Sequence, residues 1–351
     1  MSQLNPDFRS ADEITTVGPQ GWTDGTLTEQ QAIDFEKAGA DRLESDMPVA
    51  FRSRAADVPD PIMVAKWNEF QKSKGRFPGS CDWTLLDEFV HGKPIVWKPQ
   101  IIGSCVMSNT MGSLVARGMY QVALLGQPNE YLGRNEFGPQ NYAAYGPFSY
   151  GAARKRANMR SGDGLYCEAM VESLMKDGQI SCSTPKLLEI LKSNGLDGAE
   201  DFPEPQGNDG AAFYRAMGNW KHLDELRPYA DFLVTEMSYI KSADQLVESL
   251  KAGKPTFVCS MEAIHKVGTH PDGFAIHARN PRDSWAHNMA FRGYFVASDG
   301  EEFIRESNES WGADHIYNRK LSEVDKAIRT GGLTIASVGN INLPGSAPLA
   351  A

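Results

Sequence analysis

The segment PQIIGSCVMSNTMGSLVARG, residues 99 to 118, places a cysteine directly after a Gly-Ser pair. From Val106 onward apolar residues recur at helical spacing, so Cys105 stands at the start of a predicted helix that is buried nearly all round. Cysteine attacks as the thiolate, and the free N–H groups of a helix N-terminus favour that charged form. Cys105 is therefore a candidate nucleophile, and the alternative is a small buried residue at a helix start.

A catalytic thiolate also requires an imidazole within hydrogen-bond reach and a third group that orients the ring. His287, in DSWAHNMAFRGYF, is predicted at the start of a strand. The next strand leads into SNESWG, where Asn308 can bond a ring nitrogen and Trp311 can keep water from that bond. The alternatives are a strand histidine satisfied in the core or at its rim, and an asparagine that serves only the turn.

The chain that must position these residues changes character near residue 254. Before that point, helices are predicted near Pro61, after Cys105, and in FSYGAARKRAN, LYCEAMVESLMKDG, TPKLLEILKSNG, GAAFYRAMGNW and SADQLVESLKAGK. After it, strands are predicted in PTFVCSM, AHNMAFRGYFVA, EFIRESNESWG and GLTIASVGNI. Helices followed by an antiparallel sheet predict an α+β fold with a site in a cleft between the two parts.

These segments, in this order, resemble the papain-like cysteine peptidase family. RFPGSCDW is similar to the start of the mature enzymes, QIIGSC to the segment with the oxyanion-hole glutamine and the nucleophile, WAHNMAFRGY to the histidine strand, and NESWG to the Asn-Ser-Trp-Gly motif. The resemblance covers residues 76 to about 340. It implies a papain-like fold, in which a helical subdomain is followed by an antiparallel β-sheet or barrel subdomain.

Carried over by position, the resemblance implies a role for each candidate. Cys105 would attack the scissile carbonyl, His287 would form the ion pair and protonate the leaving amine, and Asn308 would orient the imidazole. Gln100 and the backbone N–H of Cys105 would bind the oxyanion. Two residues would line the substrate-binding side of the site. Gly164 would present its backbone to the substrate chain, and Trp311 would also shield the Asn–His contact from water.

The motifs depart from the family pattern at three points. Gln100 lies one residue closer to the nucleophile than usual, which shortens the oxyanion loop. Val106 stands where an aromatic residue usually follows the nucleophile. An extra residue in NESWG leaves open whether Asn308 or Glu309 orients the imidazole.

Residues 1–75 form a predicted acidic N-terminal arm with short helices, one of them over TEQQAIDFEKAGADRLE. The protein carries a net charge of −10, and residues 1–60 hold 12 acidic and 5 basic side chains. A segment with so little apolar content requires a partner surface, so we expect the arm to mediate self-association or contact with neighbouring chains. The predicted boundaries are then a papain-like domain over 76–340, with a helical part at 76–250 and a β part at 254–340, and a tail at 341–351.

Charge and hydropathy argue against other classes of protein. The negative net charge and the lack of a Lys/Arg-rich run argue against nucleic-acid binding. No apolar run approaches the roughly 20 residues that span a bilayer, so we expect no membrane partner. The start MSQLNPDFRSADEITTVG lacks the pattern of a signal peptide, and we therefore expect a cytoplasmic or virion-associated protein.

Five cysteines are scattered along the chain without a CxxC pair, which predicts mostly reduced thiols and no zinc site. Ile102 stands where secreted relatives of the family carry a structural cysteine, in agreement with a protein built without disulfides. His265, His270 and His277 lie near His287 in the sequence, but their spacing matches no zinc pattern. We therefore expect no metal and no cofactor.

The preferred interpretation is a papain-type cysteine endopeptidase that cleaves a polypeptide substrate through a Cys-His-Asn triad. The first alternative is a structural or assembly protein of a large complex, such as a virus particle, that uses the same fold with weak or no peptidase activity. The second is a Cys/His amidase acting on cell-wall peptides, which would not normally carry a Trp-Gly motif after the histidine. The sequence does not determine the substrate or the oligomeric state.

Overall fold

The computed structural model describes residues 59–342, with gaps at 77, 95–96, 127–144, 161, 183, 197–206, 231–232, 313–314 and 340. The helix predicted at 28–44 in the N-terminal arm and the tail from residue 343 therefore lie outside the described residues. Within the described ranges, no helix has both the length and the apolar character that crossing a membrane requires.

Helices dominate the first two thirds of the described chain, as the spacing of apolar residues predicts. Local signals set several of their starts: the Asp60 side chain accepts the Ile62 N–H at the start of the first helix, which begins at Pro61. The helices are α2 Pro61–Ser73, α3 Leu86–His91, α4 Cys105–Ala123, α5 Gly146–Arg156, α6 Cys167–Lys176, α7 Pro185–Ser193, α8 Gly207–Gly218, α9 Leu223–Leu226, α10 Ala243–Lys251 and α11 Leu321–Arg329.

The strands form one large sheet, in which every pair except β5–β7 is antiparallel, and one small sheet. They are β1 Cys81–Asp82, β2 Leu233–Val234, β3 Met237–Ile240, β4 Thr256–Thr269, β5 Ala275–Val296, β6 Glu302–Ser307, β7 Ile316–Lys320, β8 Leu333–Val338 and β9 Ile341–Asn342. The large sheet has the order β3-β8-β4-β5-β6-β7, and β1 pairs with β5. The first half of β5 also meets β7, at His277 and Arg319, so the sheet curls back on itself.

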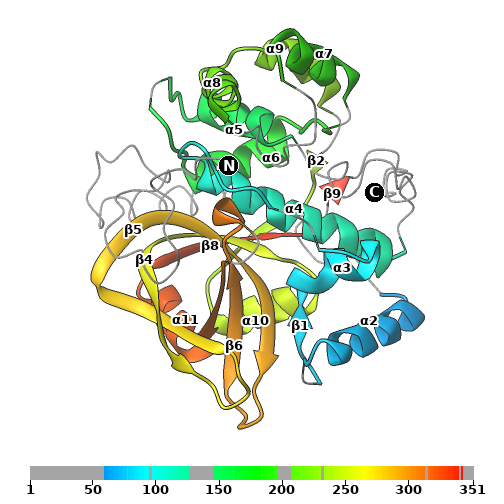
Figure 1. Ribbon diagram of the computed structural model, residues 1–351, viewed down its shortest axis with the longest axis vertical. Helices are drawn as coiled ribbons and strands as arrows, with labels where there is room; N and C mark the ends of the chain where they lie inside the picture. The colour runs from blue at the N-terminus through cyan, green and yellow to red at the C-terminus, as the bar shows by residue number, and fades with distance from the viewer. Residues whose placement is uncertain are drawn as a thin grey trace.

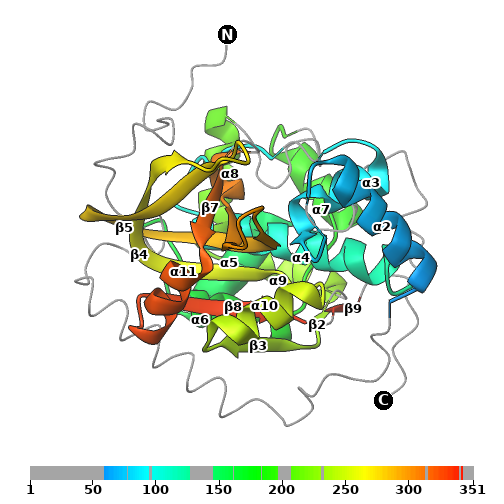
Figure 2. The same ribbon diagram turned by 90° about the horizontal axis from the view of Figure 1, so that it is seen from below.

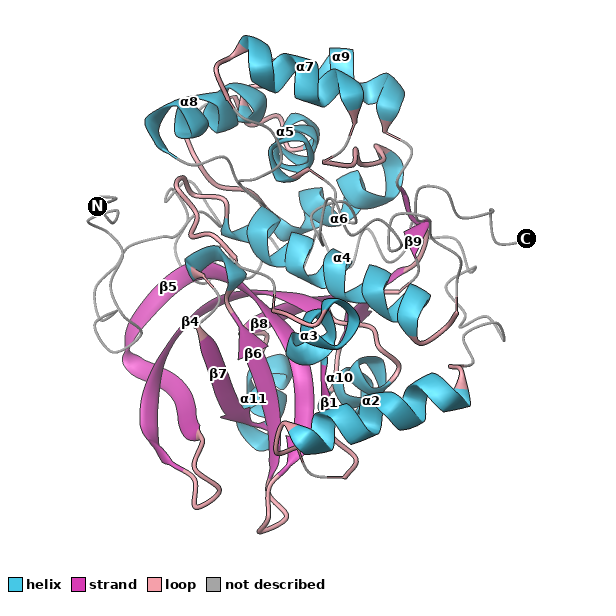
Figure 3. Ribbon diagram, turned by 45° about the vertical axis from the view of Figure 1, so that its right-hand side comes forward, coloured by secondary structure: helices cyan, strands magenta, loops and turns pink. Residues whose placement is uncertain are grey.

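Helix α4 lies between the sheet and the group of helices α5 to α9 (Figure 1). It packs on β4 and β5 on one side and on α5 and α6 on the other, which explains why it is buried from Cys105 to Gln121. Helices α10 and α11 pack against the sheet (Figure 2). Helices α4 to α9 lie in the upper part and the large sheet in the lower part, where α2, α10 and α11 also lie (Figure 3), and this arrangement agrees with the predicted α+β class.

The outer half of the β4–β5 hairpin extends beyond the predicted strands. His287 is expected at the start of a strand, but it lies in the interior of β5, which begins at Ala275. The segment before it, IHARNPRDS, alternates poorly and contains Pro281 and several charges. It is a strand because it pairs with β4, for example at His265 and Ala278, and not because one face is buried.

The expectation of a protein without disulfides is wrong. Cys167, the first residue of α6, and Cys259 in β4 form a disulfide with a Cα–Cα distance of 6.5 Å. Cys81, Cys105 and Cys182 are buried and form no disulfide within the described residues. The two bonded cysteines are 92 residues apart and are brought together only by the packing of the helical layer on the sheet, so spacing along the chain does not reveal the pair.

Candidate active site

Cys105 is the first residue of α4, as predicted, and Ser104 precedes it at the N-cap. Its side chain is fully buried and takes part in no disulfide among the described residues. It belongs to an apolar cluster that also contains Leu165, Cys259 and Ala286. Because N–H groups of the first helical turn have no partner within the helix, this position offers a thiolate electrostatic stabilisation.

The imidazole of His287 and the amide of Asn308 are in direct contact. His287 is fully buried in β5, and its Nε2 lies 3.1 Å from Oδ1 of Asn308. The indole of Trp311 stacks on the imidazole, with 4.7 Å between ring centroids and 25° between ring planes. Because an amide oxygen only accepts hydrogen bonds, Nε2 carries the proton in this contact, and Nδ1 is the basic atom of a neutral ring.

Ser310 and the backbone of the turn hold Asn308 in this orientation. The Ser310 hydroxyl donates to Oδ1 of Asn308 at 2.6 Å and lies 3.3 Å from Nε2 of His287. The Asn308 N–H donates to the carbonyl of His315 at 2.9 Å, and its own carbonyl accepts the Trp311 N–H at 3.0 Å. The amide is therefore fixed from both its side chain and its backbone.

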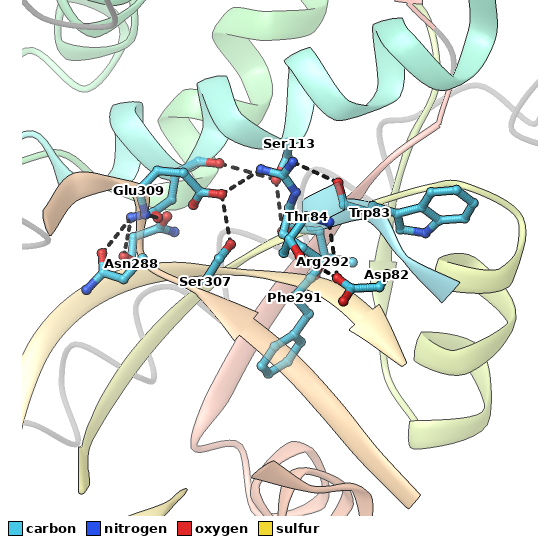
Figure 4. A network of polar contacts seen from close by, with 12 residues as sticks. Asp82, Trp83, Thr84, Ser113, Asn288, Phe291, Arg292, Ser307 and Glu309 are labelled. Carbon is cyan, nitrogen blue, oxygen red and sulfur yellow. Dashed lines mark hydrogen bonds and ion pairs between the residues drawn. The ribbon is translucent and has the colours of Figure 1, made fainter. Parts of the chain in front are cut away.

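Glu309 faces away from the imidazole. Its Oε1 lies 2.5 Å from Nη1 of Arg292 and accepts the Ser307 hydroxyl at 2.8 Å, as Figure 4 shows. The side chains of Glu309 and Arg292 are each only 4% exposed. Asn308 is thus the residue next to His287. The cause is the 3₁₀ turn Glu309–Trp311, η6, because successive residues of such a turn point roughly 120° apart.

Gln100 lies in the segment before α4, and this segment is tied to the turn that carries Asn308. The Gln100 backbone N–H donates to the carbonyl of Ser310 at 2.7 Å. The Gln100 side chain is buried, and its Oε1 has no hydrogen-bond partner within the described part of the chain. The shortened spacing therefore still buries Gln100 beside the turn.

Gly164 has a φ of 107°, a conformation that favours glycine. Both of its backbone groups are engaged inside the helical layer. Its N–H donates to the Tyr150 hydroxyl at 2.9 Å, and its carbonyl accepts from Nη1 of Arg154 at 2.6 Å. A substrate strand could receive the Gly164 N–H only by replacing the tyrosine, so the expected substrate contact stays a prediction.

Strand β6, which leads into the asparagine turn, carries a buried ion cluster. Glu306 is fully buried, and Nη1 of Arg319 lies 3.5 Å from its Oε2, while Nη2 of Arg319 donates to Glu262 at 2.7 Å. Burial raises the pKa of Glu306 to about 7, and the positive charge of Arg319 offsets this only in part.

Within the described ranges, His270, Asp299 and Glu301 are the group whose ligand atoms lie close enough to hold a metal ion, all within 4.8 Å. Each of these atoms already has a partner. Nδ1 of His270 accepts the Asp272 N–H at 3.1 Å, so the ring proton lies on Nε2 and points to Asp299, 3.2 Å away. Nζ of Lys320 lies 2.7 Å from Oε1 of Glu301. These contacts join the loops at this end of the sheet to one another.

No protein-family model matches the chain, and no curated protein does so either. Solved structures of cysteine proteases do match. Xylellain from Xylella fastidiosa has 17% identity and a TM-score of 0.48, over 84% of this chain and 94% of that one. Bromelain from Ananas comosus has 13% identity and a TM-score of 0.38, over 75% and 100%.

A third match is proCathepsin B S9 from Trypanosoma congolense, with 13% identity and a TM-score of 0.41, over 75% of this chain and 77% of that one. The three matched structures all have TM-scores below 0.5. At this level of likeness they establish neither an activity nor a substrate for this protein.

Sequence reasoning missed two polar side chains that hold the site together. Arg292, five residues after His287, pairs with Glu309, and its strand position gives no hint of a buried partner. Asn109 is fully buried on α4, one turn after Cys105. The available signal is its spacing, because residues four apart lie on the same face of a helix.

Proposed function

We propose that this protein is a papain-type cysteine hydrolase that cleaves peptide bonds, with Cys105 as nucleophile, His287 as acid and base, and Asn308 as the residue that orients the ring. The observation that carries the proposal is the contact of 3.1 Å between His287 Nε2 and Asn308 Oδ1 under the stacked Trp311. The helix that begins at Cys105 packs on β5, which carries His287, and on η6, which follows its N-cap residue Asn308.

In the proposed reaction, Nδ1 of His287 takes the thiol proton of Cys105, which gives a thiolate and an imidazolium. The sulfur forms a bond to the carbonyl carbon of the peptide, and the carbonyl oxygen takes the negative charge. The Gln100 side chain and the Cys105 N–H donate to that oxygen. When the C–N bond breaks, the imidazolium proton passes to the leaving amine, and a thioester remains.

Water then attacks the thioester carbon while His287 accepts its proton. The C–S bond breaks, the carboxylic acid leaves, and the thiol of Cys105 is restored. This scheme requires the sulfur of Cys105 and a ring nitrogen of His287 within or slightly beyond hydrogen-bond reach. A separation above about 6 Å in a crystal structure, with no rotamer that closes it, would count against catalysis.

Alkylation by iodoacetamide tests the nucleophile directly. Burial raises the pKa of Cys81 and of Cys182 to about 12, so these two thiols are internal controls. At neutral pH, Cys105 should react faster than either by about a hundredfold or more, as followed by peptide mass spectrometry. The Cys105→Ser variant should lose the label and the turnover of an unstructured peptide substrate. Equal labelling of the three thiols in the folded protein would contradict the proposal.

The assembly function and the amidase function remain alternatives, and no contact within the described ranges favours either. The assembly function depends on the N-terminal arm, whose residues 1–58 lie outside the described ranges. We propose that residues 1–60 of the arm contact other chains, and light scattering of a protein that lacks these residues would test this. The Cys167–Cys259 disulfide favours an oxidising compartment and counts against the expected cytoplasmic location.

A further inference from the structure

The side chain of Asn109 lies where the three elements of the proposed triad meet. Asn109 is on α4 one turn after Cys105 and is fully buried. A buried amide that offers two donors and an acceptor is costly unless each finds a partner. Its contacts therefore show which parts of the protein it connects.

Asn109 bonds the residue that follows His287 and the residue that follows Asn308. Its Nδ2 donates to the carbonyl of Asn288, the residue after His287, at 2.6 Å. Its Oδ1 accepts the N–H of Glu309, the residue after Asn308, at 2.8 Å. Asn288 and Glu309 are both drawn in Figure 4.

Two longer contacts of the same amide complete the link. Nδ2 lies 3.1 Å from the carbonyl of Cys105 and 3.4 Å from Oδ1 of Asn308. One side chain thus bonds the nucleophile's own carbonyl, the strand of the histidine and the turn of the asparagine. The adjacent polar side chain, Thr110, instead donates its hydroxyl to the carbonyl of Val106 in its own helix at 2.5 Å.

We infer that Asn109 is a positioning residue, which holds β5 and η6 in register with α4 and so keeps the His287 ring on Asn308 and facing Cys105. This inference rests on the proposed function for its effect on reactivity. Its structural part, the placement of the ring against Asn308, stands on the contacts of Asn109 alone. Asn109 touches neither substrate nor reacting atoms in this scheme.

The test compares Asn109→Leu and Asn109→Asp with Thr110→Val as the matched control. Leu has a similar volume and removes every polar contact, whereas Asp keeps an acceptor for the Glu309 N–H and loses both donors. Thr110 is equally buried on the same helix and bonds only within it in the described structure. Both Asn109 variants are made so that the test survives if one of them does not fold.

The first measurement is the ring N–H resonance of His287 in a ¹H–¹⁵N spectrum, assigned by its absence from the His287→Gln variant. A slowly exchanging Nε2–H is expected in the wild type and in Thr110→Val, and its loss is expected in both Asn109 variants. This readout does not depend on any activity. Retention of the signal in both Asn109 variants would overturn the inference.

The second measurement is the pH profile of Cys105 alkylation. Displacement of the imidazolium should raise the midpoint pH by about one unit in both Asn109 variants, which corresponds to about tenfold slower alkylation below the midpoint, and leave it unchanged in Thr110→Val. An equal midpoint in all four proteins would refute the positioning role while the proposed function stands. Unselective labelling in the wild type would refute the proposed function, and the ring resonance would still decide the role of Asn109.

Discussion

Replacing Glu306 by Gln should make the protein more stable above about pH 7 and remove part of its pH dependence. Glu306 is fully buried in β6, and within the described part of the chain neither carboxylate oxygen has a hydrogen-bond partner. Arg319 lies 3.5 Å away and also bonds Glu262 at 2.7 Å, so the guanidinium keeps a carboxylate partner when Glu306 is neutral. Neutralising Glu306 therefore removes a poorly solvated charge without leaving Arg319 alone.

The sign follows from the direction of the pKa change. The unfolded chain releases this proton near the ordinary value of 4.5, and the folded protein releases it near about 7. Between pH 4.5 and about pH 7 the folded state keeps this proton and the unfolded state has lost it. The contribution of Glu306 to stability is therefore largest below pH 4.5 and is lost as pH rises through about 7. A tenfold change in proton affinity is about 1.4 kcal/mol, so the wild type should lose about 3 kcal/mol over this range relative to Glu306→Gln.

Urea unfolding of both proteins between about pH 5 and about pH 8, followed by tryptophan fluorescence, measures this difference. The difference between the two stability curves isolates Glu306, because every other titrating group is common to both proteins. It should increase in favour of the variant and level off above about pH 7. A flat difference curve, or a variant that is less stable than the wild type at the alkaline end, would refute the reasoning.

Three further changes test the contacts around the site by urea unfolding. Reducing the Cys167–Cys259 disulfide should lower the free energy of unfolding by about 4 kcal/mol, because the bond closes a loop with a sequence separation of 92 in the unfolded chain. Dithiothreitol should not shift the unfolding midpoint of the Cys167→Ala/Cys259→Ala double variant. Glu309→Gln should cost about 3 kcal/mol by leaving the buried charge of Arg292 without its counter-ion, and a loss below about 1 kcal/mol would mean that the pair is solvated. Gly112→Ala should cost about 1 to 3 kcal/mol, because the added Cβ would lie 2.8 Å from Cδ of Glu309; in a Glu309→Ala background the cost should shrink, and additive losses would contradict this contact.

The helical layer and the start of α4 follow from local patterns. Apolar spacing after Cys105 predicts a buried helix, and α4 begins at that residue. Strand predictions succeed where one face or both faces are buried, as from Ala286 to Phe295 in β5. They fail in the outer hairpin, where Val267 is 53% exposed and pairing alone holds the strands. Patterns of burial cannot predict strands that gain little from burial.

Around the candidate site, too, the sequence predicts some side-chain contacts, and others depend on the assembled fold. An imidazole and an amide can form a hydrogen bond, so the residue types predict the contact between His287 and Asn308. Whether Asn308 or Glu309 is the partner of the imidazole depends on the 3₁₀ turn η6. Counting along the motif cannot determine which way successive residues of such a turn point. Asn109 and Arg292 are found only when the helix, the strand and the turn are placed together, because each has partners far away in the sequence.

The extra residue in NESWG is accommodated by two positions on other elements. A glutamate turned into the protein requires a counter-charge and space. Arg292 supplies the charge at 2.5 Å, and Gly112 on α4 has no side chain where the Glu309 methylenes pack. Because Glu309 is held between α4 and β5, its turn η6 is fixed against the elements that carry Cys105 and His287. The inward Glu309 thus anchors the turn, and this explains why the neighbouring Asn308 reaches the imidazole although the motif is one residue longer.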